Sequence, residues 1–155
     1  MVIRYRLRVG IGVLILAALL LAACGGGSQS DPRKVVIAMF GAMEKNDQAT
    51  LARLLDLAEL MKNTDTDYSM QTAEPRVFTN PKDVLDDLTN EGKTKARWFK
   101  HQRIVNEAEI IGDHATVGVT FVDKAASKMY ITKFGLHKVN DKWRIYSFKT
   151  EDAEY

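Results

Sequence analysis

The hydrophobic pattern of this chain changes its period once, near Phe99, and no other feature constrains the fold as strongly. Before that point apolar residues recur three and four positions apart, which is typical of one face of an α-helix. Beyond it, in residues 115–121, apolar side chains alternate with Thr and Gly, as on one face of a β-strand. Helices followed by a run of antiparallel strands predict an α+β fold, with N-terminal helices packed on a curved antiparallel sheet.

Local capping signals indicate two helices at the start of this region. Asp31 followed by Pro32 is an N-cap with proline at the first helical position, and apolar residues at helical spacing continue through residues 36–43. The Asn-Asp pair at 46–47 interrupts this helix and caps a second one, whose apolar stripe covers residues 51–61. We expect these two helices to pack as a hairpin.

A polar segment separates the second helix from a third. Residues 63–80 are rich in Thr, Asp and Ser, so we expect a long loop there, with a short strand over residues 76–78. Asn80 followed by Pro81 repeats the cap-plus-proline signal, and Gly92 is placed to end this third helix.

Turn signals divide the remainder of the chain into strands. The turns are expected at Gly-Asp 112–113, at Ala-Ala-Ser 125–127 and at Asn-Asp 140–141. The first strand is expected to end at residue 111, and the next three to cover residues 115–121, 129–139 and 142–148.

The N-terminal 23 residues have the charge and length of a secretory signal peptide. Three arginines and no acidic residue precede an apolar run over residues 9–23, which is shorter than the roughly 20 residues that a membrane span needs. The sequence Leu-Ala-Ala-Cys at residues 21–24 resembles the bacterial lipobox, whose cysteine is diacylated before cleavage. We therefore expect Cys24 to be the lipidated N-terminus of an exported lipoprotein. The alternatives are an uncleaved transmembrane anchor and an ordinary signal peptide with an incidental cysteine.

This interpretation divides the chain into four parts: a lipoprotein signal peptide (1–23), a lipidated cysteine with a flexible Gly/Ser tether (24–30), an α+β domain (31–150) and a C-terminal tail (151–155). The expected partner is a membrane, through the lipid on Cys24. In a Gram-negative bacterium this is the periplasmic face of the outer membrane, because Gly25 stands where the sorting rule of enteric lipoproteins puts a retention aspartate. Otherwise it is the outer face of the cell membrane.

Charge and cysteine content narrow the remaining functions. The leader carries three of the 22 basic residues, so 19 basic and 20 acidic residues remain without it, a formal charge of −1. No basic stripe is left to bind nucleic acid. Cys24 is the only cysteine, so the mature domain has no disulfide and no thiol nucleophile. Neither a metal site nor a cofactor is expected, because the three histidines are scattered and no phosphate-binding glycine loop follows a strand.

Four local patterns, in this order, resemble the nuclear transport factor two-like superfamily, whose cystatin-like α+β cone also occurs in small bacterial lipoproteins of uncharacterised role. They are the opening helix at 32–43, the Asn-Asp break at 46–47, the turn at 111–117 and the closing hairpin at 138–145. The resemblance implies a pocket between the concave face of the sheet and the helices. Relatives include enzymes and non-catalytic binding modules, and many form dimers through the sheet, so a homodimer is a further expectation.

The resemblance makes the interior of the cone the candidate ligand-binding site. Its candidate residues are Trp98, Tyr130, Phe134 and His137. By strand parity, His137 is the histidine that we expect to reach the cone. The alternative is that the aromatic side chains fill the core, which a domain of this size needs. For the basic and aromatic stretch at 97–101 we also expect a role in the core, with its aromatic residues entering the first strand and its basic residues in solvent.

Two functions are weighed, and a third, a structural lipoprotein whose domain only spaces other components, is not distinguished from the first of them by sequence. The first is a membrane-anchored, non-catalytic binding module that captures a small ligand or a protein of the cell envelope, with no catalytic residue assigned. The second is an enzyme of the isomerase or dehydratase type, in which His101 or His137 forms an acid–base pair. The carboxylate partner is then Glu109, Asp113 or Asp123. A histidine and a carboxylate within hydrogen-bond reach inside the cone favour the enzyme.

Overall fold

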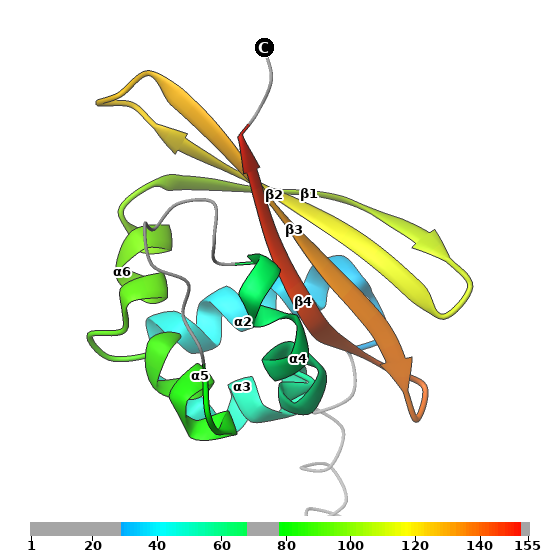
Figure 1. The fold of residues 1–155 in the computed structure, drawn as a ribbon. Coiled ribbons are helices and arrows are strands. Elements are labelled where there is room, and N and C mark those ends of the chain that lie inside the picture. Colours follow the sequence, from blue (N-terminus) through cyan, green and yellow to red (C-terminus); the bar gives the residue numbers. More distant parts are fainter. Residues whose placement is uncertain (1–28, 68–77, 153–155) are drawn as a thin grey trace, which may run out of the picture.

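In the computed structural model, which describes residues 29–67 and 78–152, helices come first and strands follow (Figure 1). The helices are α2 (Pro32–Glu44), α3 (Gln48–Leu54), α4 (Leu57–Asp67), α5 (Pro81–Asp87) and α6 (Lys93–Phe99). The strands are β1 (Gln102–Ile111), β2 (His114–Asp123), β3 (Lys128–Val139) and β4 (Lys142–Asp152). They form one sheet in the order β1-β2-β3-β4, and each neighbouring pair is antiparallel. The α+β prediction is confirmed.

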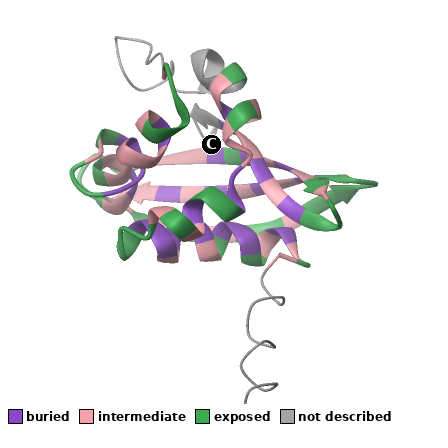
Figure 2. Ribbon diagram, turned by 90° about the horizontal axis from the view of Figure 1, so that it is seen from below, coloured by how far each residue is buried: buried purple, intermediate pink, exposed green. Residues whose placement is uncertain are grey.

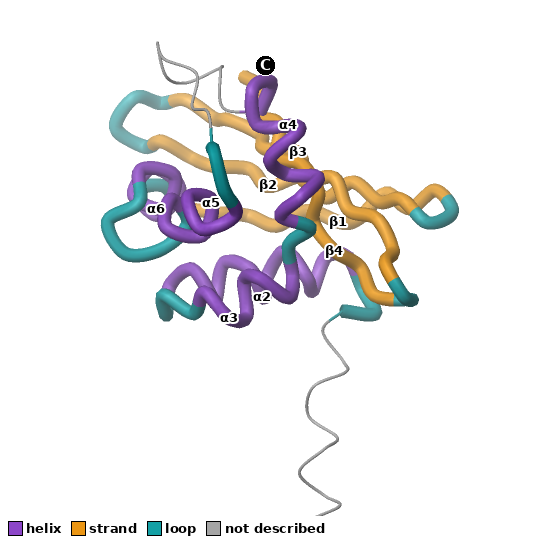
Figure 3. Tube along the Cα trace, turned by 60° about the horizontal axis from the view of Figure 1, so that its bottom comes forward, coloured by secondary structure: helices purple, strands orange, loops and turns teal. Residues whose placement is uncertain are grey.

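The two layers meet over a single core. The helices lie on one face of the curved sheet (Figure 1), and α4 runs beside β4, the strand at one edge (Figure 3). Buried residues line the sides of the elements that face the other layer, whereas the hairpin turns are exposed (Figure 2). We call the face of the sheet that is turned away from the helices the outer face. Within the described residues, no helix has both the length and the apolarity that crossing a membrane requires.

The local signals at both ends of the domain act as predicted. The Asp31 side chain accepts hydrogen bonds from the backbone N–H groups of Arg33 and Lys34, so α2 begins at its expected cap. Asn140 and Asp141 both have positive φ, 51° and 59°, as a two-residue hairpin turn that matches the twist of the strands requires. The four strands begin and end within a few residues of the expected positions, apart from the longer β4.

The second helix is not continuous, which corrects the prediction. Leu55 is extended, with φ −99° and ψ 143°, and forms a parallel bridge with Ile145 of β4. The N–H of Asp56 donates to the carbonyl of Ile145 at 2.8 Å. The apolar spacing did not reveal this break, because the buried Leu55 also fits the apolar stripe of a helix. The chain becomes helical again in α4, which includes residues 63–67 of the expected loop.

The third helix also ends earlier than predicted. It stops at Asp87, and Gly92 is the N-cap of a further helix, α6, not the end of α5. Trp98 and Phe99 are therefore helical and do not enter the first strand, which begins only at Gln102. Gly92 is suited to this position because its α-carbon lies against the carbonyl groups at the end of α5.

Several predictions concern residues outside the described ranges. The signal peptide, Cys24 and the glycines of the tether lie there, and so do residues 76 and 77 of the short strand expected at 76–78. Phe78, which is described, is not part of a strand. The lipid anchor therefore stays a prediction from the sequence.

Candidate functional site

The side of the sheet that faces the helices carries a cluster of aromatic rings, which we call the aromatic cluster. Trp98 of α6 lies at its centre and is 3% exposed. Its ring stacks on Phe121 at a centroid distance of 5.9 Å and meets Phe134 and Phe148 edge-on, each at 5.5 Å. Phe40 of α2 closes the cluster at 5.8 Å from Trp98. Two predicted ligand-binding residues, Trp98 and Phe134, are thus brought together by packing between the two layers.

Tyr130, the third predicted ligand-binding residue, lies at the margin of this core. Its ring is 6.3 Å from that of His101, and His101 Nδ1 is 4.0 Å from Asp123 Oδ2. That separation exceeds hydrogen-bond length. Asp123 instead accepts hydrogen bonds from the backbone N–H groups of Ala126 and Ala125 in the β2–β3 turn. These amides, with a smaller contribution from the His101 charge, hold the pKa of the Asp123 carboxyl below its usual value.

His137, the fourth predicted residue, lies on the outer face. Its neighbour Leu136 is fully buried against the helices, and successive side chains of a strand point to opposite faces. The expectation that His137 reaches the cone is therefore corrected, because the helices cover the other face of β3. On the outer face, its ring lies 4.9 Å from Tyr146 and 6.4 Å from His114, and its Nε2 is 3.0 Å from Asp56 Oδ2. We call these four residues the outer-face cluster.

A β-bulge makes room for this arrangement. The register between β3 and β4 shifts after Gly135, so that Tyr146 is an extra residue in β4. A β-carbon on Gly135 would point to the outer face, where it would meet the Ser147 hydroxyl and lie 3.1 Å from Cζ of Tyr146. The glycine thus allows the Tyr146 ring to lie across β3. The sequence pattern placed Tyr146 on the same face as Phe148, which the bulge corrects, and it did not single out Gly135, although a glycine inside a strand pattern is a known sign of a bulge.

Asp56 has two roles within the outer-face cluster. It precedes α4 as its N-cap, and its Oδ1 accepts from the N–H of Glu59 at 3.2 Å. Its Oδ2 faces His137 Nε2, in a contact where a protonated ring nitrogen donates to the carboxylate. The two side chains are 21% and 23% exposed. The pair therefore joins the start of α4 to the outer face of the sheet and fixes the orientation of the imidazole ring.

Replacing Asp56 tests this joining role. We expect Asp56→Ala to lower the free energy of unfolding by about 1–3 kcal/mol, because it removes a helix cap and a hydrogen bond together. Asp56→Asn is the matched control, since asparagine caps equally well and keeps an oxygen for His137, and its loss should be smaller. Urea denaturation of the two variants measures the difference. If Asp56→Ala and the parent are equally stable, neither the helix cap nor the contact between Asp56 and His137 stabilises the fold.

Of the carboxylates named for the enzyme alternative, Asp123 lies nearest to a histidine, but its 4.0 Å separation from His101 is beyond hydrogen-bond reach. Asp113 lies in the exposed β1–β2 turn and pairs with Lys138 at 3.5 Å. Glu109 is exposed on β1, and Asp123 is held by its turn. Within the described ranges, no three metal-ligating side chains lie close enough together to hold an ion.

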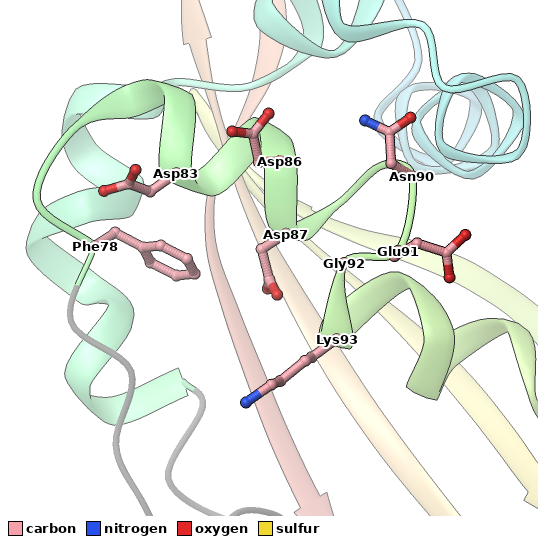
Figure 4. Close-up of a pocket in the computed structure, with 8 residues that line it drawn as sticks. All are labelled: Phe78, Asp83, Asp86, Asp87, Asn90, Glu91, Gly92 and Lys93. Atoms are coloured by element: carbon pink, nitrogen blue, oxygen red, sulfur yellow. The ribbon is translucent and has the colours of Figure 1, made fainter.

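A separate hollow of about 490 Å³ opens beside α5 and the start of α6 (Figure 4). Its lining residues are Phe78, Asp83, Asp86, Asp87, Asn90, Glu91, Gly92 and Lys93. Its three aspartates have structural partners. Asp83 closes the capping box of α5, Asp86 accepts from Lys82 and Gln48, and Asp87 accepts from the N–H of Thr94. The acidity of the hollow follows from how α5 is capped and joined to its neighbours.

Comparison with known proteins gives a fold. No family model matches the chain, and no curated protein sequence matches it significantly. Among solved structures, an NTF2 protein with five substitutions is 15% identical, with 77% of this chain and 95% of that chain covered and a TM-score of 0.52.

Two other matches are more distant in structure. A proposed dehydratase of the NTF2-like family from Streptomyces avermitilis is 18% identical, covers 78% of this chain and 93% of its own, and has a TM-score of 0.49. An NTF2-like protein with a cystatin-like fold from Novosphingobium aromaticivorans is 15% identical, with coverages of 94% and 93% and a TM-score of 0.46. With helices on one face of a four-stranded antiparallel sheet, the chain has the nuclear transport factor two-like α+β fold.

Proposed function

We propose that this protein is a lipid-anchored lipoprotein of the bacterial cell envelope whose folded domain binds another protein and catalyses no reaction. The anchor is the lipid on Cys24, and its support is the charged n-region, the short apolar run and the lipobox. The binding role is supported by the way the domain uses its aromatic residues.

The aromatic cluster is the observation that carries the proposal. Five rings occupy the space between helices and sheet, and the most buried of them, Phe134, has no exposed surface. A small ligand needs a cavity that encloses most of its surface, and the rings of the aromatic cluster occupy the part of that space between α2, α6 and the sheet. We therefore place the binding of a partner on the surface of the domain.

The outer face of the sheet is the surface that best suits this role. Among the described residues no helix packs on it, and it combines the outer-face cluster with apolar side chains such as Ile104, which is 49% exposed, and the half-buried Ile131. A face that combines exposed aliphatic side chains with a tyrosine and histidines resembles the composition of protein interfaces. The partner is an envelope protein, and a second copy of this chain is one form that such a partner can take.

Site-specific photocrosslinking tests the binding role in cells. A photoreactive residue at Thr116, on the outer face of β2 beside the outer-face cluster, should capture a partner, whereas the same residue at Ala58, exposed on α4, should not. A product of twice the mass of the chain identifies a homodimer, and a heavier or lighter product another envelope protein. Equal capture from both positions, or none from Thr116, would contradict binding through the outer face.

Acyl labelling tests the anchor separately. Cells fed radiolabelled palmitate should incorporate label into the parent chain and not into Cys24→Ser, and the parent should sediment with membranes. Unlabelled parent protein, or membrane association that persists in Cys24→Ser, would favour one of the alternatives, an ordinary signal peptide or an uncleaved anchor.

One observation supports a second candidate function, an acid–base enzyme of the isomerase or dehydratase type. His137 is within hydrogen-bond distance of a carboxylate, and the Tyr146 ring lies beside it. The carboxylate is Asp56, which was not among the expected partners, and the pair lies on the outer face. If the pair is catalytic, His137→Gln should abolish proton exchange at carbon next to a ketone in test substrates and leave stability nearly unchanged, and unaltered exchange would exclude it.

A further inference from the structure

The tip of the β1–β2 hairpin is apolar where a turn is normally polar. Ile110 and Ile111 precede the turn residues Gly112 and Asp113, and they are 55% and 83% exposed. Arg33, in the first turn of α2, contacts β1 at the carbonyl of Val105, so Ile111 lies about 20 Å further along the strand, beyond this contact with the helix layer. The core does not account for these two isoleucines.

The same end of the domain holds the start of the described chain. The carbonyl of Gln29 accepts from the N–H of Trp143 at 3.0 Å, and Trp143 pairs with Lys138 across the β3–β4 hairpin. The N–H of Lys138 in turn donates to the carbonyl of Asp113 at 3.0 Å. Three lateral steps of about 5 Å therefore separate Gln29 from the tip of the β1–β2 hairpin. Figure 1 shows the beginning of α2 at the same end of the domain as the β1–β2 turn and the β3–β4 turn.

The length of the tether limits the distance between this end of the domain and the membrane. Five residue steps separate Cys24 from Gln29, which span at most about 17 Å when fully extended. If Cys24 carries lipid, Gln29 cannot be further than this from the surface of the bilayer. The tip at Ile110 and Ile111 lies within the same distance range, whereas the β2–β3 turn is at the far end of the strands, about 30 Å away.

We propose that Ile110 and Ile111 insert into the interfacial layer of the bilayer that holds the lipid anchor, and so orient the domain with its strands steep to the membrane. The inference rests on the proposed lipid anchor at Cys24. Around the tip, Lys138 pairs with Asp113, Lys142 stands beside Asp141 and Glu109 adds a negative charge, so these residues give no excess of positive charge that would attract anionic lipid. The contact is therefore apolar, and neutral phosphatidylcholine suffices as the membrane. In this orientation the outer face of the sheet stays open to an envelope partner.

A fluorescent label at the tip tests the insertion. The thiol of Cys24 is acylated in the mature lipoprotein, so Ile111→Cys supplies a single free thiol for an environment-sensitive dye. The matched control is Ala126→Cys, exposed in the β2–β3 turn. Both lipoproteins are made from the full chain, and the mass of each mature N-terminus is measured. They are then reconstituted into phosphatidylcholine vesicles.

We expect the dye at position 111, and not at 126, to shift to shorter wavelength and to be quenched by lipids with a quencher near the headgroup. Equal access of a water-soluble quencher to both dyes on acylated protein would overturn the insertion and leave the lipid anchor standing. A shift at 111 without quenching by lipid would also overturn it, since a second protein then covers the tip. An N-terminus without acyl chains would overturn the anchor and the insertion together.

Discussion

Trp98→Ala should lower the free energy of unfolding by about 3–5 kcal/mol, because truncating a buried aromatic side chain removes its burial and leaves a cavity. Trp98 contacts four other rings of the aromatic cluster and bridges α6 to three strands. The residues around Trp98 belong to separate helices and strands, which cannot all move inward to fill the cavity that its removal leaves. Because a domain of this size is stable by only about 5–15 kcal/mol, this one change removes a large part of the total.

Urea denaturation of the mature chain carrying Cys24→Ser, followed by circular dichroism, measures the effect. Trp98→Phe is the conservative variant and should lose much less, since the ring cluster is kept. Ile104→Ala, on the exposed outer face, should change stability by no more than about 0.5 kcal/mol. If Trp98→Ala loses less than about 1 kcal/mol, the cluster is loosely packed, and binding of a small ligand by Trp98 and Phe134 becomes the better interpretation.

Gly92→Ala should destabilise the domain by about 1–3 kcal/mol, although it adds only one methyl group. The added carbon would meet the carbonyl group of Asp87 at a distance that no real structure shows, and would lie 2.6 Å from the carbonyl oxygen of Asp86. Both neighbours are backbone atoms at the end of α5, so no side chain can turn away. The junction between α5 and α6 must open for the variant to fold.

Gly41→Ala is the matched control for this prediction. Gly41 lies inside α2 and nothing lies within 4 Å of its added β-carbon. Alanine favours a helix over glycine by about 0.8–1 kcal/mol, so this variant should gain stability. The same chemical change thus has opposite expected signs at two positions. Thermal or urea unfolding in which both variants lose stability equally would show that crowding at the α5–α6 junction is not the cause.

Much of the fold was predictable because its signals are local. The cap of α2 depends on Asp31 and the two N–H groups that follow it, and the last hairpin depends on an Asn-Asp pair that tolerates positive φ. Each signal lies within a few residues of its effect. The change of hydrophobic period adds the order of the elements, and order together with antiparallel hairpins leaves few topologies.

The break at Leu55 was not predictable from the same kind of pattern. What ends α3 there is a bridge to Ile145, a residue of the last strand. An apolar residue satisfies a helical stripe and a strand edge equally well, so hydrophobic spacing does not distinguish them. Gly92 was misassigned for a related reason, because a glycine can follow one helix or begin the next.

The candidate site was predicted only in part. From the sequence we expected Trp98, Phe134 and His137 to line one pocket inside the cone. In the structure the first two share the aromatic cluster, and His137 lies on the opposite face beside Asp56, which is 81 residues away along the chain. Tyr146 joins it only through the bulge opposite Gly135.

The sequence by itself determined the caps at Asp31 and Asn80, the hairpin turns and most of the alternation along the strands, because each depends on neighbouring residues, and it predicts the leader with its lipobox. Only the tertiary structure decided which face of the sheet is interior. Alternation separates the side chains of β3 into two sets, and the packing of α2 and α6 against one set made Phe134 core and left His137 outside. The contacts that stabilise this arrangement join segments that are far apart in the sequence, so no local pattern predicts them.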